Sequence, residues 1–600
     1  MVSNLMHGLV RQRTQSLLAE HNSDRYHYTL PPQWAMWSKC MNTRICIIGS
    51  GPTGIFTLKT LVASPVPLII SVFDAELVAG KGTPYLPGAN DPVMLSNIPS
   101  IEIPPLMETL VDWLNRQSND YLSTFNINRS SINDREFYPR LVIGDYFHDQ
   151  FQAILSVGKI NRHRVEVYPG HRVTDIELGT TDIRLKVSSF DGDFDAVFDH
   201  VVMATGHNWP ENTQVKPGYF ASPWPATELQ EIGDGRLGIL GTSLSGIDAL
   251  LTVATSCGSF VCDAGGTLQY VTSAGHQDFH ATMMSRKGLL PEADFYCPLP
   301  YIEPQICTYE AIQNEVNIGS QGLLDRVFDL FQRELLAADP DYSAEIGLSH
   351  LSVDTFADAY YGRRSDTDPF VWAAANLAEA HLNFELQFTI PWRYAILITH
   401  EIIEKAIPHL DTTDLTRFNR SFKGIFIDQY ATVPHLSIRR LLALRNAGRL
   451  DIIKLGSDYD IETEGLERGA RIRTGDREQQ FSSFIDATGQ SSLSVRELPF
   501  PTLLKQRGIQ AANTPEPERR FLDGESANFK KTGGLEIDEA YRPRGATALS
   551  NRLYCVAIPF LLHKRPFVQG ITSAAELGKT AANAILADIA VDQPPILRMA

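Results

Sequence analysis

A glycine-rich segment near residue 50 has the residue types and the spacing of a dinucleotide-binding turn. The apolar residues 45–48 lead directly into Gly49-Ser50-Gly51-Pro52-Thr53-Gly54, and apolar residues at helical intervals follow. Asp74 ends the next apolar run, 20 positions beyond Gly54, where such folds carry an acid for the ribose. A helix that starts at this turn directs free N–H groups and its positive dipole end at a pyrophosphate. We therefore predict a bound dinucleotide here; the alternative is a purely structural turn.

The same arrangement returns near residue 240. The apolar residues 237–240 precede Gly241-Thr242-Ser243-Leu244-Ser245-Gly246, in which Ser243 replaces the middle glycine, so an ordinary strand-to-helix turn is the alternative. The next apolar run, residues 280–284, ends in Ser285-Arg286-Lys287 and not in an acid. Because bases suit a 2′-phosphate better than a ribose hydroxyl, we predict NADPH at this second turn. The alternative for Arg286 and Lys287 is a solvated surface pair.

Three further segments point to a ligand. Two apolar runs end in small residues that let the chain leave a sheet, namely Ala204-Thr205-Gly206 and Asp486-Ala487-Thr488-Gly489. Near the C-terminus, Pro566-Phe567-Val568-Gln569 precedes a long alanine-rich helical segment that opens at Gly570-Ile571. The N-terminus of such a helix would stabilise negative charge on a reduced flavin; the alternative is an ordinary helix start. Together with the two turns, these segments predict FAD at the first turn and a nicotinamide cofactor at the second.

The composition limits the classes of function. The chain has 600 residues and a net charge of −17, so it is too long for one core and too acidic for a nucleic-acid surface. No apolar run reaches the roughly 18 residues of a membrane span, and residues 1–40 lack the apolar core of a secretory signal. Cys257 and Cys262 follow the second turn, whereas the redox cysteine pair of disulfide reductases lies in the first FAD helix. We expect reduced thiols, a cytoplasmic location and no metal site.

We predict an α/β fold with two Rossmann-like dinucleotide-binding domains, one for FAD and one for NADPH, and a mainly helical insertion. The insertion is predicted because residues such as 321–338 are apolar at helical intervals. Its apolar face is either core or a cap over the flavin. The predicted parts are an N-terminal extension (1–40), a first part of the FAD domain (41–235), the NADPH domain (236–300), the helical insertion (301–450) and a second part of the FAD domain (451–590).

From residue 41 to about residue 587, the sequence resembles the FAD-NAD(P)-binding oxidoreductases of the YdhS-like group. The segments that carry the resemblance are both glycine turns and residues 94–99, 137–146, 285–298 and 566–570. The resemblance implies the fold and both cofactors, FAD and NADPH. It does not define the reaction.

The group is related to flavin-dependent N-monooxygenases, which include the aspartate N-hydroxylases. Lysine and ornithine N-hydroxylases carry a Met and Asn-or-Gln loop and then a Phe-x-x-Arg…Tyr helix start, to which residues 94–97 and 137–146 are similar. The resemblance implies that Met94, Asn97 and Arg140 lie at the cofactors. It also implies that NADPH reduces FAD, and that O₂ then forms a C4a-hydroperoxyflavin which N-hydroxylates an amine.

In such chemistry the flavin supplies the reactive oxygen, so the protein positions the substrate and excludes water. A small acidic amino acid would need positive partners for its carboxylates. Lys81, between two glycines, is the leading candidate, and the further ones are Arg439, Arg440, Lys564 and Arg565. Each has a solvated base as its alternative. Asn97 is either a ligand of flavin or nicotinamide or a turn residue.

The sequence therefore predicts an FAD- and NADPH-dependent oxidoreductase, specifically a monooxygenase that uses O₂ to N-hydroxylate a small amino acid or amine. Two other functions stay open. One is an NADPH-dependent reductase of a quinone or protein acceptor. The other is a flavin-bound redox sensor, for which the serine at position 243 leaves room. The sequence does not define the substrate or whether the protein forms a homo-oligomer.

Overall fold

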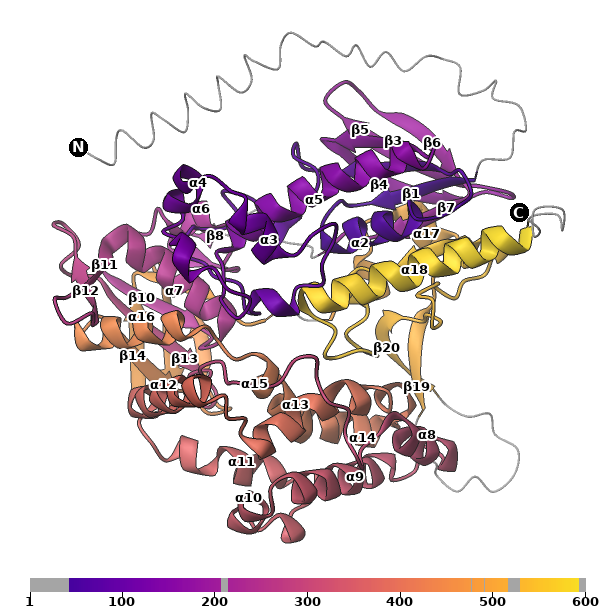
Figure 1. Ribbon diagram of the computed structural model, residues 1–600. Coiled ribbons are helices and arrows are strands. Elements are labelled where there is room, and N and C mark those ends of the chain that lie inside the picture. The colour runs from indigo at the N-terminus through magenta and orange to yellow at the C-terminus, as the bar shows by residue number, and fades with distance from the viewer. Residues whose placement is uncertain (1–42, 207–213, 476, 490–491, 516–528, 593–600) are drawn as a thin grey trace. The chain divides into compact units, whose positions relative to one another are not determined.

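The structure, a computed structural model, describes residues 43–206, 214–475, 477–489, 492–515 and 529–592 (Figure 1). The predicted N-terminal extension, residues 1–40, lies outside these ranges. The described chain forms two separate sheets built mainly from parallel strands, together with a helical region. This architecture confirms the predicted α/β class with two Rossmann-like units.

The first sheet carries the first glycine turn. Its five strands are parallel and follow the order β21-β7-β1-β2-β3. The Ile, Val and Phe side chains of the central strands are buried, as expected for a parallel sheet that is covered on both faces. The strands are β1 (Arg44–Ile48), β2 (Ile69–Asp74), β3 (Arg164–Pro169), β7 (His200–Met203) and β21 (Leu553–Cys555).

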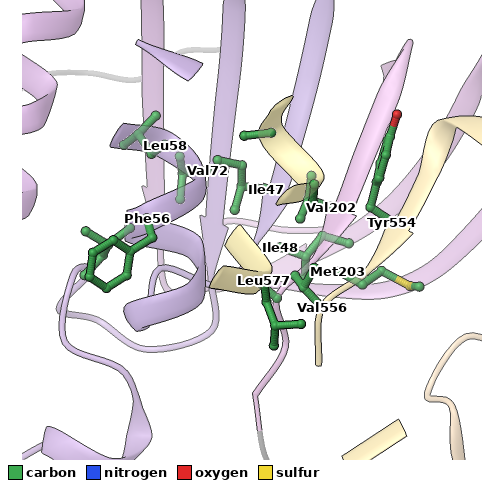
Figure 2. Packing of buried hydrophobic residues seen from close by; sticks show 14 of the residues in the cluster. Ile47, Ile48, Phe56, Leu58, Val72, Val202, Met203, Tyr554, Val556 and Leu577 are labelled. Carbon is green, nitrogen blue, oxygen red and sulfur yellow. The ribbon is translucent and has the colours of Figure 1, made fainter. Parts of the chain in front are cut away.

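Two helices that are far apart in the sequence pack together against this sheet. A Cβ on Gly578 of α18 (Gly570–Asp592) would lie only 2.6 Å from the carbonyl oxygen of Thr53 in α2 (Pro52–Leu61). Figure 2 shows Phe56 of α2 and Leu577 of α18 in the same apolar cluster as side chains of the strands. The first domain is therefore built from both ends of the described chain.

Other elements complete this domain. An antiparallel sheet lies between β3 and β7 in the sequence, and α5 contributes buried aromatic side chains to the same core. These elements are β4 (His171–Leu178), β5 (Ile183–Ser189), β6 (Phe194–Phe198), α3 (Leu110–Asn115), α4 (Asn119–Thr124) and α5 (Arg140–Ile160).

The second sheet carries the second glycine turn, and its strand order is β14-β13-β10-β18-β9-β8. Neighbouring strands are parallel except for the pair β8–β9. The helix α7 (Leu244–Cys257) follows β10 directly, as predicted. The strands are β8 (Gln214–Lys216), β9 (Tyr219–Phe220), β10 (Arg236–Leu240), β13 (His280–Ser285), β14 (Leu450–Lys454) and β18 (Ser483–Asp486).

This topology corrects two of the predicted domain boundaries. β14 pairs with β13, and β18 pairs with β10, so residues 450–486 belong to the second nucleotide domain and not to the FAD domain. β9 also pairs with β18, so the first part of the FAD domain ends before residue 214. The sequence could not show these partners, because strands that pair in parallel are joined by long crossover connections.

Helices fill most of residues 309–446, as predicted. Many of them share a core rich in phenylalanine, whereas α12 and α16 contribute to the core of the second nucleotide domain. The predicted boundary of the insertion at residue 450 is therefore too late. The helices are α8 (Tyr309–Ile318), α9 (Leu323–Ala338), α10 (Pro340–Glu345), α11 (Phe356–Ser365), α12 (Pro369–Leu386), α13 (Pro391–Glu404), α14 (Thr412–Arg417), α15 (Lys423–Tyr430) and α16 (His435–Asn446).

Regular structure also occurs within residues 501–535. It includes α17 (Pro501–Lys505) and an antiparallel pair formed by β19 (Ala511–Pro515) and β20 (Phe529–Leu535).

Among the helices that the structure describes, none combines the length and hydropathy needed to cross a membrane.

Candidate cofactor and active site

The two glycine turns have the same backbone construction. Gly49 and Gly241 have positive φ values of 102° and 127°, which residues with a Cβ rarely adopt. A Cβ on Gly49 would lie 2.3 Å from the carbonyl oxygen of Ala204, and one on Gly241 would lie 2.7 Å from that of Ala487. Each turn is therefore packed against the alanine of one A-T-G strand end.

The last glycine of each turn allows the helix to approach the strand. A Cβ on Gly54 would lie 2.0 Å from the carbonyl oxygen of Gly49, and one on Gly246 would lie 2.4 Å from that of Gly241. The N-caps of α2 and α7 make no side-chain hydrogen bond to their helices. The first N–H groups of both helices therefore stay available for an anion. The two turns fit the phosphates of two dinucleotides.

Asp74 ends β2, as predicted, and its carboxylate also holds the first turn. Oδ2 accepts hydrogen bonds from the hydroxyl of Ser50 and, at 2.9 Å, from its N–H, while Oδ1 accepts one from the Glu76 N–H at 2.9 Å. The Ser50 hydroxyl also accepts one from the Gly80 N–H at 2.7 Å. Ser50 is thus a buried anchor of the turn, and its role as a cofactor ligand stays a prediction. Asp74 keeps lone pairs that a ribose hydroxyl can use.

The second turn is closed against the end of β13. The Thr242 hydroxyl donates to the carbonyl of Leu289 at 2.6 Å and lies 3.0 Å from the hydroxyl oxygen of Ser285. Ser285 in turn accepts a hydrogen bond from the Gly288 N–H at 3.1 Å. Thr242 and Ser285, both predicted as cofactor ligands, therefore hold the turn together. Ser243 is the exposed N-cap of α7 and stands where Gly51 stands in the first turn.

The two bases after β13 have different surroundings. Arg286 is exposed and has no ion-pair partner among the residues that the structure describes. The ammonium of Lys287 lies 3.1 Å from the ring centre of Tyr361 on α11, a cation–π contact. Desolvation of this ammonium lowers the pKa of Lys287 to about 8, although the residue as a whole is exposed. Arg286 is thus available to a 2′-phosphate, whereas Lys287 contacts the helical region.

The two segments that resemble N-monooxygenases lie side by side. Leu95 and Pro139 form an antiparallel bridge, and the Ser96 N–H donates to the Tyr138 carbonyl at 2.9 Å. The Arg140 N–H donates to the Met94 carbonyl at 3.0 Å. Residues 94–96 and 138–140 therefore form one ribbon, and Met94 is buried in it.

Arg140 joins this ribbon to the second nucleotide helix. Its Nε donates to the Leu95 carbonyl at 3.1 Å, and its Nη2 lies 2.6 Å from Oδ2 of Asp248 on α7. The Arg140 and Asp248 side chains are only 14% and 10% exposed. Burial raises the pKa of Asp248, and the charge of Arg140 opposes that rise. The ion pair therefore ties the Met94 segment to the helix that starts at the second turn.

Lys81, the leading substrate candidate, is already paired. Its ammonium lies 2.7 Å from Oδ1 of Asp145, whose other oxygen accepts a hydrogen bond from Tyr121 at 2.8 Å. The neighbouring Gly82 does lie at the first turn, because its Cβ would be 2.9 Å from the Gly51 Cα. The location of Lys81 therefore agrees with the prediction, but its charge is balanced within the protein.

The other candidate bases do not gather at one site. Arg440 donates to the Val93 carbonyl at 2.9 Å, and burial lowers its pKa to about 10, with Arg439 adding to the shift. Arg439 itself is exposed. Lys564 pairs with Glu536 at 2.7 Å, and Arg565 pairs with Glu404 at 2.8 Å. Of these bases, Arg440 is the one that contacts the residue next to Met94.

Most of the remaining predicted ligands are partly or fully exposed. Asn97 is half-buried and makes no side-chain hydrogen bond within the described chain, and Thr205 and Gly206 are exposed beside the first turn. At the second turn, Asp486 instead accepts two hydrogen bonds from Thr488, and Gly489 is exposed. At the start of α18, Gly570 has a φ of 76°, whereas the Ile571 side chain is in the core.

Sequence reasoning missed a group of polar residues in and around the segment 291–298. Asp294 accepts a hydrogen bond from the Thr432 hydroxyl at 3.2 Å. Burial raises the pKa of Asp294 to about 7, and Glu102 adds to the rise. The hydroxyl of Tyr430 is buried without a hydrogen-bond partner among the described residues. The sequence could not predict this group, because its members are far apart in the chain and no local motif marks any of them.

Cys257 and Cys262 do not form a disulfide. Both are free, as are the four other cysteines in the described part of the chain. Cys257 is buried at the end of α7, and Cys262 is exposed on the strand β11 (Gly258–Cys262). The structure therefore gives no support to a dithiol redox centre at these two positions.

Comparison with known families agrees with this architecture. Residues 46–208 match the FAD-NAD(P)-binding family, and residues 308–430 match the YdhS-like middle domain. The first match covers the first glycine turn, Asp74 and the Arg140 ribbon. The second match covers most of the helical region, from just before α8 to the end of α15.

The chain is similar to the uncharacterized protein YdhS of Escherichia coli strain K12. The two are 39% identical over 546 residues, which is 90% of this chain and 97% of YdhS. Among solved structures, it resembles the Kutzneria sp. 744 ornithine N-hydroxylase KtzI with 13% identity and a TM-score of 0.44, over 92% of this chain and 99% of that one.

It also resembles the cadaverine monooxygenase DfoA of Erwinia amylovora. The identity is 11% and the TM-score 0.45, over 91% of this chain and 95% of DfoA. These two structural similarities are too distant to indicate a reaction. The similarity to YdhS, in contrast, extends along nearly the whole chain at 39% identity, and it shows that the chain belongs to the YdhS-like family, whose members combine an FAD-NAD(P)-binding domain with the YdhS-like middle domain.

Proposed function

We propose that the protein is an FAD- and NADPH-dependent monooxygenase that N-hydroxylates a small amino acid or another primary amine. The observation that carries the proposal is the Arg140 junction. The two segments that resemble N-monooxygenases form one ribbon, and the ion pair with Asp248 holds this ribbon to the helix of the second nucleotide turn. Cofactors bound at the two turns would therefore have the same segment beside them.

The site residues of the chain would act by binding the cofactors and orienting the substrate. The first turn and Asp74 would hold FAD, and the second turn and Arg286 would hold NADPH. The Asn97 side chain follows the ribbon of residues 94–96 and 138–140 and makes no hydrogen bond to another described residue. It is therefore our candidate for contact with the flavin, the nicotinamide or the substrate. When bound and reduced, FAD would supply the oxygen-transferring chemistry, which needs no strong protein base.

The proposal is tested by product analysis. Purified FAD-loaded protein is mixed with NADPH, ¹⁸O₂ and a panel of small amino acids and diamines, and products are identified by mass spectrometry. We expect one amine to gain a single ¹⁸O atom in proportion to the NADPH consumed. If every amine gives only hydrogen peroxide, the monooxygenase proposal is wrong. A quinone panel then tests the reductase, and failure of NADPH to reduce the FAD would favour the sensor.

Arg286→Ala is expected to weaken NADPH use selectively. Loss of a charge-assisted hydrogen bond to a phosphate costs about 1.5–3 kcal/mol, so the KM for NADPH should rise about 10- to 100-fold. The KM for NADH should change little, because NADH has no 2′-phosphate. Steady-state flavin reduction with both cofactors measures the ratio.

Lys287→Ala is the matched control for this prediction. The Lys287 ammonium lies against the Tyr361 ring, so its removal should leave the preference for NADPH within about threefold of the wild type. A larger loss of NADPH preference in Lys287→Ala than in Arg286→Ala would contradict the assignment of Arg286.

A further inference from the structure

The turn before α18, residues 565–570, is held by a buried carboxylate of the helical region. Oε1 of Glu404, the last residue of α13, accepts a hydrogen bond from the Phe567 N–H at 3.0 Å. Oε2 of the same carboxylate lies 2.8 Å from Nε of Arg565. The Glu404 side chain is only 3% exposed. One buried group therefore fixes both the backbone and a side chain of this turn.

The Phe567 ring adds a second attachment. It is 6% exposed and lies in the phenylalanine-rich core of the helical region, although its neighbours in the sequence belong to the FAD domain. Such aromatic contacts are directional, so they define where the turn sits. The ring centres nearest to that of Phe567 are those of Phe426 at 5.5 Å, His400 at 5.7 Å, Phe418 at 6.0 Å and Tyr430 at 6.1 Å.

Arg565 also binds a carboxylate on α18 itself. Its Nη1 lies 2.9 Å from Oε1 of Glu576, whose side chain is 48% exposed. The guanidinium therefore connects α13 to the second turn of α18. Glu576 makes the same type of ion pair as Glu404 but from within α18, so the two carboxylates form a matched pair for an experiment.

The start of α18 lies about two helical turns before the point where this helix packs against α2. Gly578 packs against Thr53 and Thr57 in α2, which is the helix of the first nucleotide turn. Gly570 lies eight residues earlier, about 12 Å along the helix axis at 1.5 Å per residue. Gly570 begins the helix with a positive φ of 76°, and a Cβ there would have nothing within 4 Å. The N-terminus of α18 is therefore open on the side to which a Cβ of Gly570 would point.

The helical region contacts the second nucleotide domain through α11, which is itself bonded to α15. The Tyr361 hydroxyl donates to the Gly424 carbonyl at 2.9 Å, while the Tyr361 ring lies under the Lys287 ammonium. Arg364 lies 2.6 Å from Oδ2 of Asp428 and donates to the Leu290 carbonyl. The helical region thus contacts the turn before α18 and, through α11, also the segment after β13.

We propose that the YdhS-like middle domain is a brace for α18, in which Glu404 and Phe567 are positioning residues that hold the helix N-terminus against the flavin ring. A helix N-terminus stabilises nearby negative charge, and reduced flavin is anionic, so this placement favours the reduced state. The inference rests on the proposed FAD site at the first turn. It does not depend on the substrate or on oxygen transfer.

The test measures the flavin midpoint potential and the visible circular dichroism of bound FAD in purified variants. Glu404→Ala removes both contacts of the carboxylate, whereas Glu404→Gln keeps an acceptor for the Phe567 N–H and loses the charge next to Arg565. Phe567→Leu keeps an apolar side chain without the ring contacts. We expect the preference for reduced FAD to fall by up to about tenfold, a potential ~30 mV more negative, with Glu404→Gln affected least.

Glu576→Gln is the control, because it removes a partner of Arg565 without touching the middle domain. Its potential and dichroism should match those of the wild type. If Glu404→Ala fails to hold FAD, Glu404→Gln and Phe567→Leu carry the test. Unchanged potentials in both of these, or an equal shift in Glu576→Gln, would overturn the brace. A wild type that holds FAD but oxygenates no amine would contradict the proposed function and leave this test intact.

Discussion

Gly54→Ala protein is expected to be purified without FAD, whereas Gly246→Ala protein is expected to be yellow and insensitive to NADPH. The added methyl group would lie 2.0 Å from the Gly49 carbonyl oxygen in the first variant and 2.4 Å from that of Gly241 in the second. Each turn must then open, because backbone atoms cannot move aside as a side chain can. Strain of about 1–3 kcal/mol at a binding site corresponds to up to about 100-fold in affinity.

Flavin content is measured by absorbance after release from the protein, and NADPH binding by the rate of anaerobic flavin reduction. Gly233→Ala is the control, since a Cβ there would have no atom within 4 Å. It should resemble the wild type in both measurements. If Gly54→Ala retained FAD and lost only NADPH reduction, the two cofactors would have been assigned to the wrong turns.

Arg140→Met is expected to lower the free energy of unfolding by about 3–5 kcal/mol, because it leaves the buried carboxylate of Asp248 without its partner. The double variant Arg140→Met/Asp248→Leu replaces both charges by apolar groups and should recover most of this loss. Urea unfolding followed by tryptophan fluorescence gives both values. A double variant no more stable than the single one would show that the ion pair is not the reason for the loss.

The same variant should acquire a pH dependence. Burial already raises the pKa of Asp248 in the wild type, and without Arg140 nothing on that residue opposes the rise. A carboxyl with a higher pKa when folded binds more protons in the folded state, so stability falls as the pH rises from about 4, its unfolded value, towards the folded pKa. The deficit of Arg140→Met relative to wild type should therefore be larger at pH 8 than at pH 5, and the double variant should lack this trend.

Arg140→Met also separates the structural and functional roles of the junction. At pH 5, where protonation of Asp248 limits the loss of stability, the variant should still bind FAD at the first turn, which Arg140 does not contact. The ribbon of residues 94–96 and 138–140 would, however, lose its ion pair to α7. We expect slower reduction of FAD by NADPH with unchanged flavin content.

Local chemistry made both nucleotide turns predictable from the sequence. In each, the strand, the glycines and the helix are contiguous, so Gly49 to Gly54 and Gly241 to Gly246 carry their own geometry. The positive φ of Gly49 and of Gly241 and the close approach of Gly54 and Gly246 are consequences of that local order. The helical periodicity of residues 321–338 was sufficient to predict a helix for the same reason, and the structure has α9 at Leu323–Ala338.

What depends on partners distant in the sequence could not be predicted. The residues around Lys81 in the sequence do not indicate that Asp145 balances its charge. The residues around Arg286 and Lys287 likewise do not indicate that Lys287 contacts an aromatic ring. The assignment of β14 and β18 to the second sheet likewise depends on which strands become neighbours after folding.

The sequence by itself thus determined the two nucleotide turns, the α/β class and the helical insertion, because each of these is encoded within a few tens of consecutive residues. The tertiary structure decided which charges remain free, which strands share a sheet, and that Arg140 with Asp248 and Glu404 with Phe567 connect separate parts of the chain. The last two contacts join residues more than 100 positions apart, and whether a charge is available depends on what lies next to it in space.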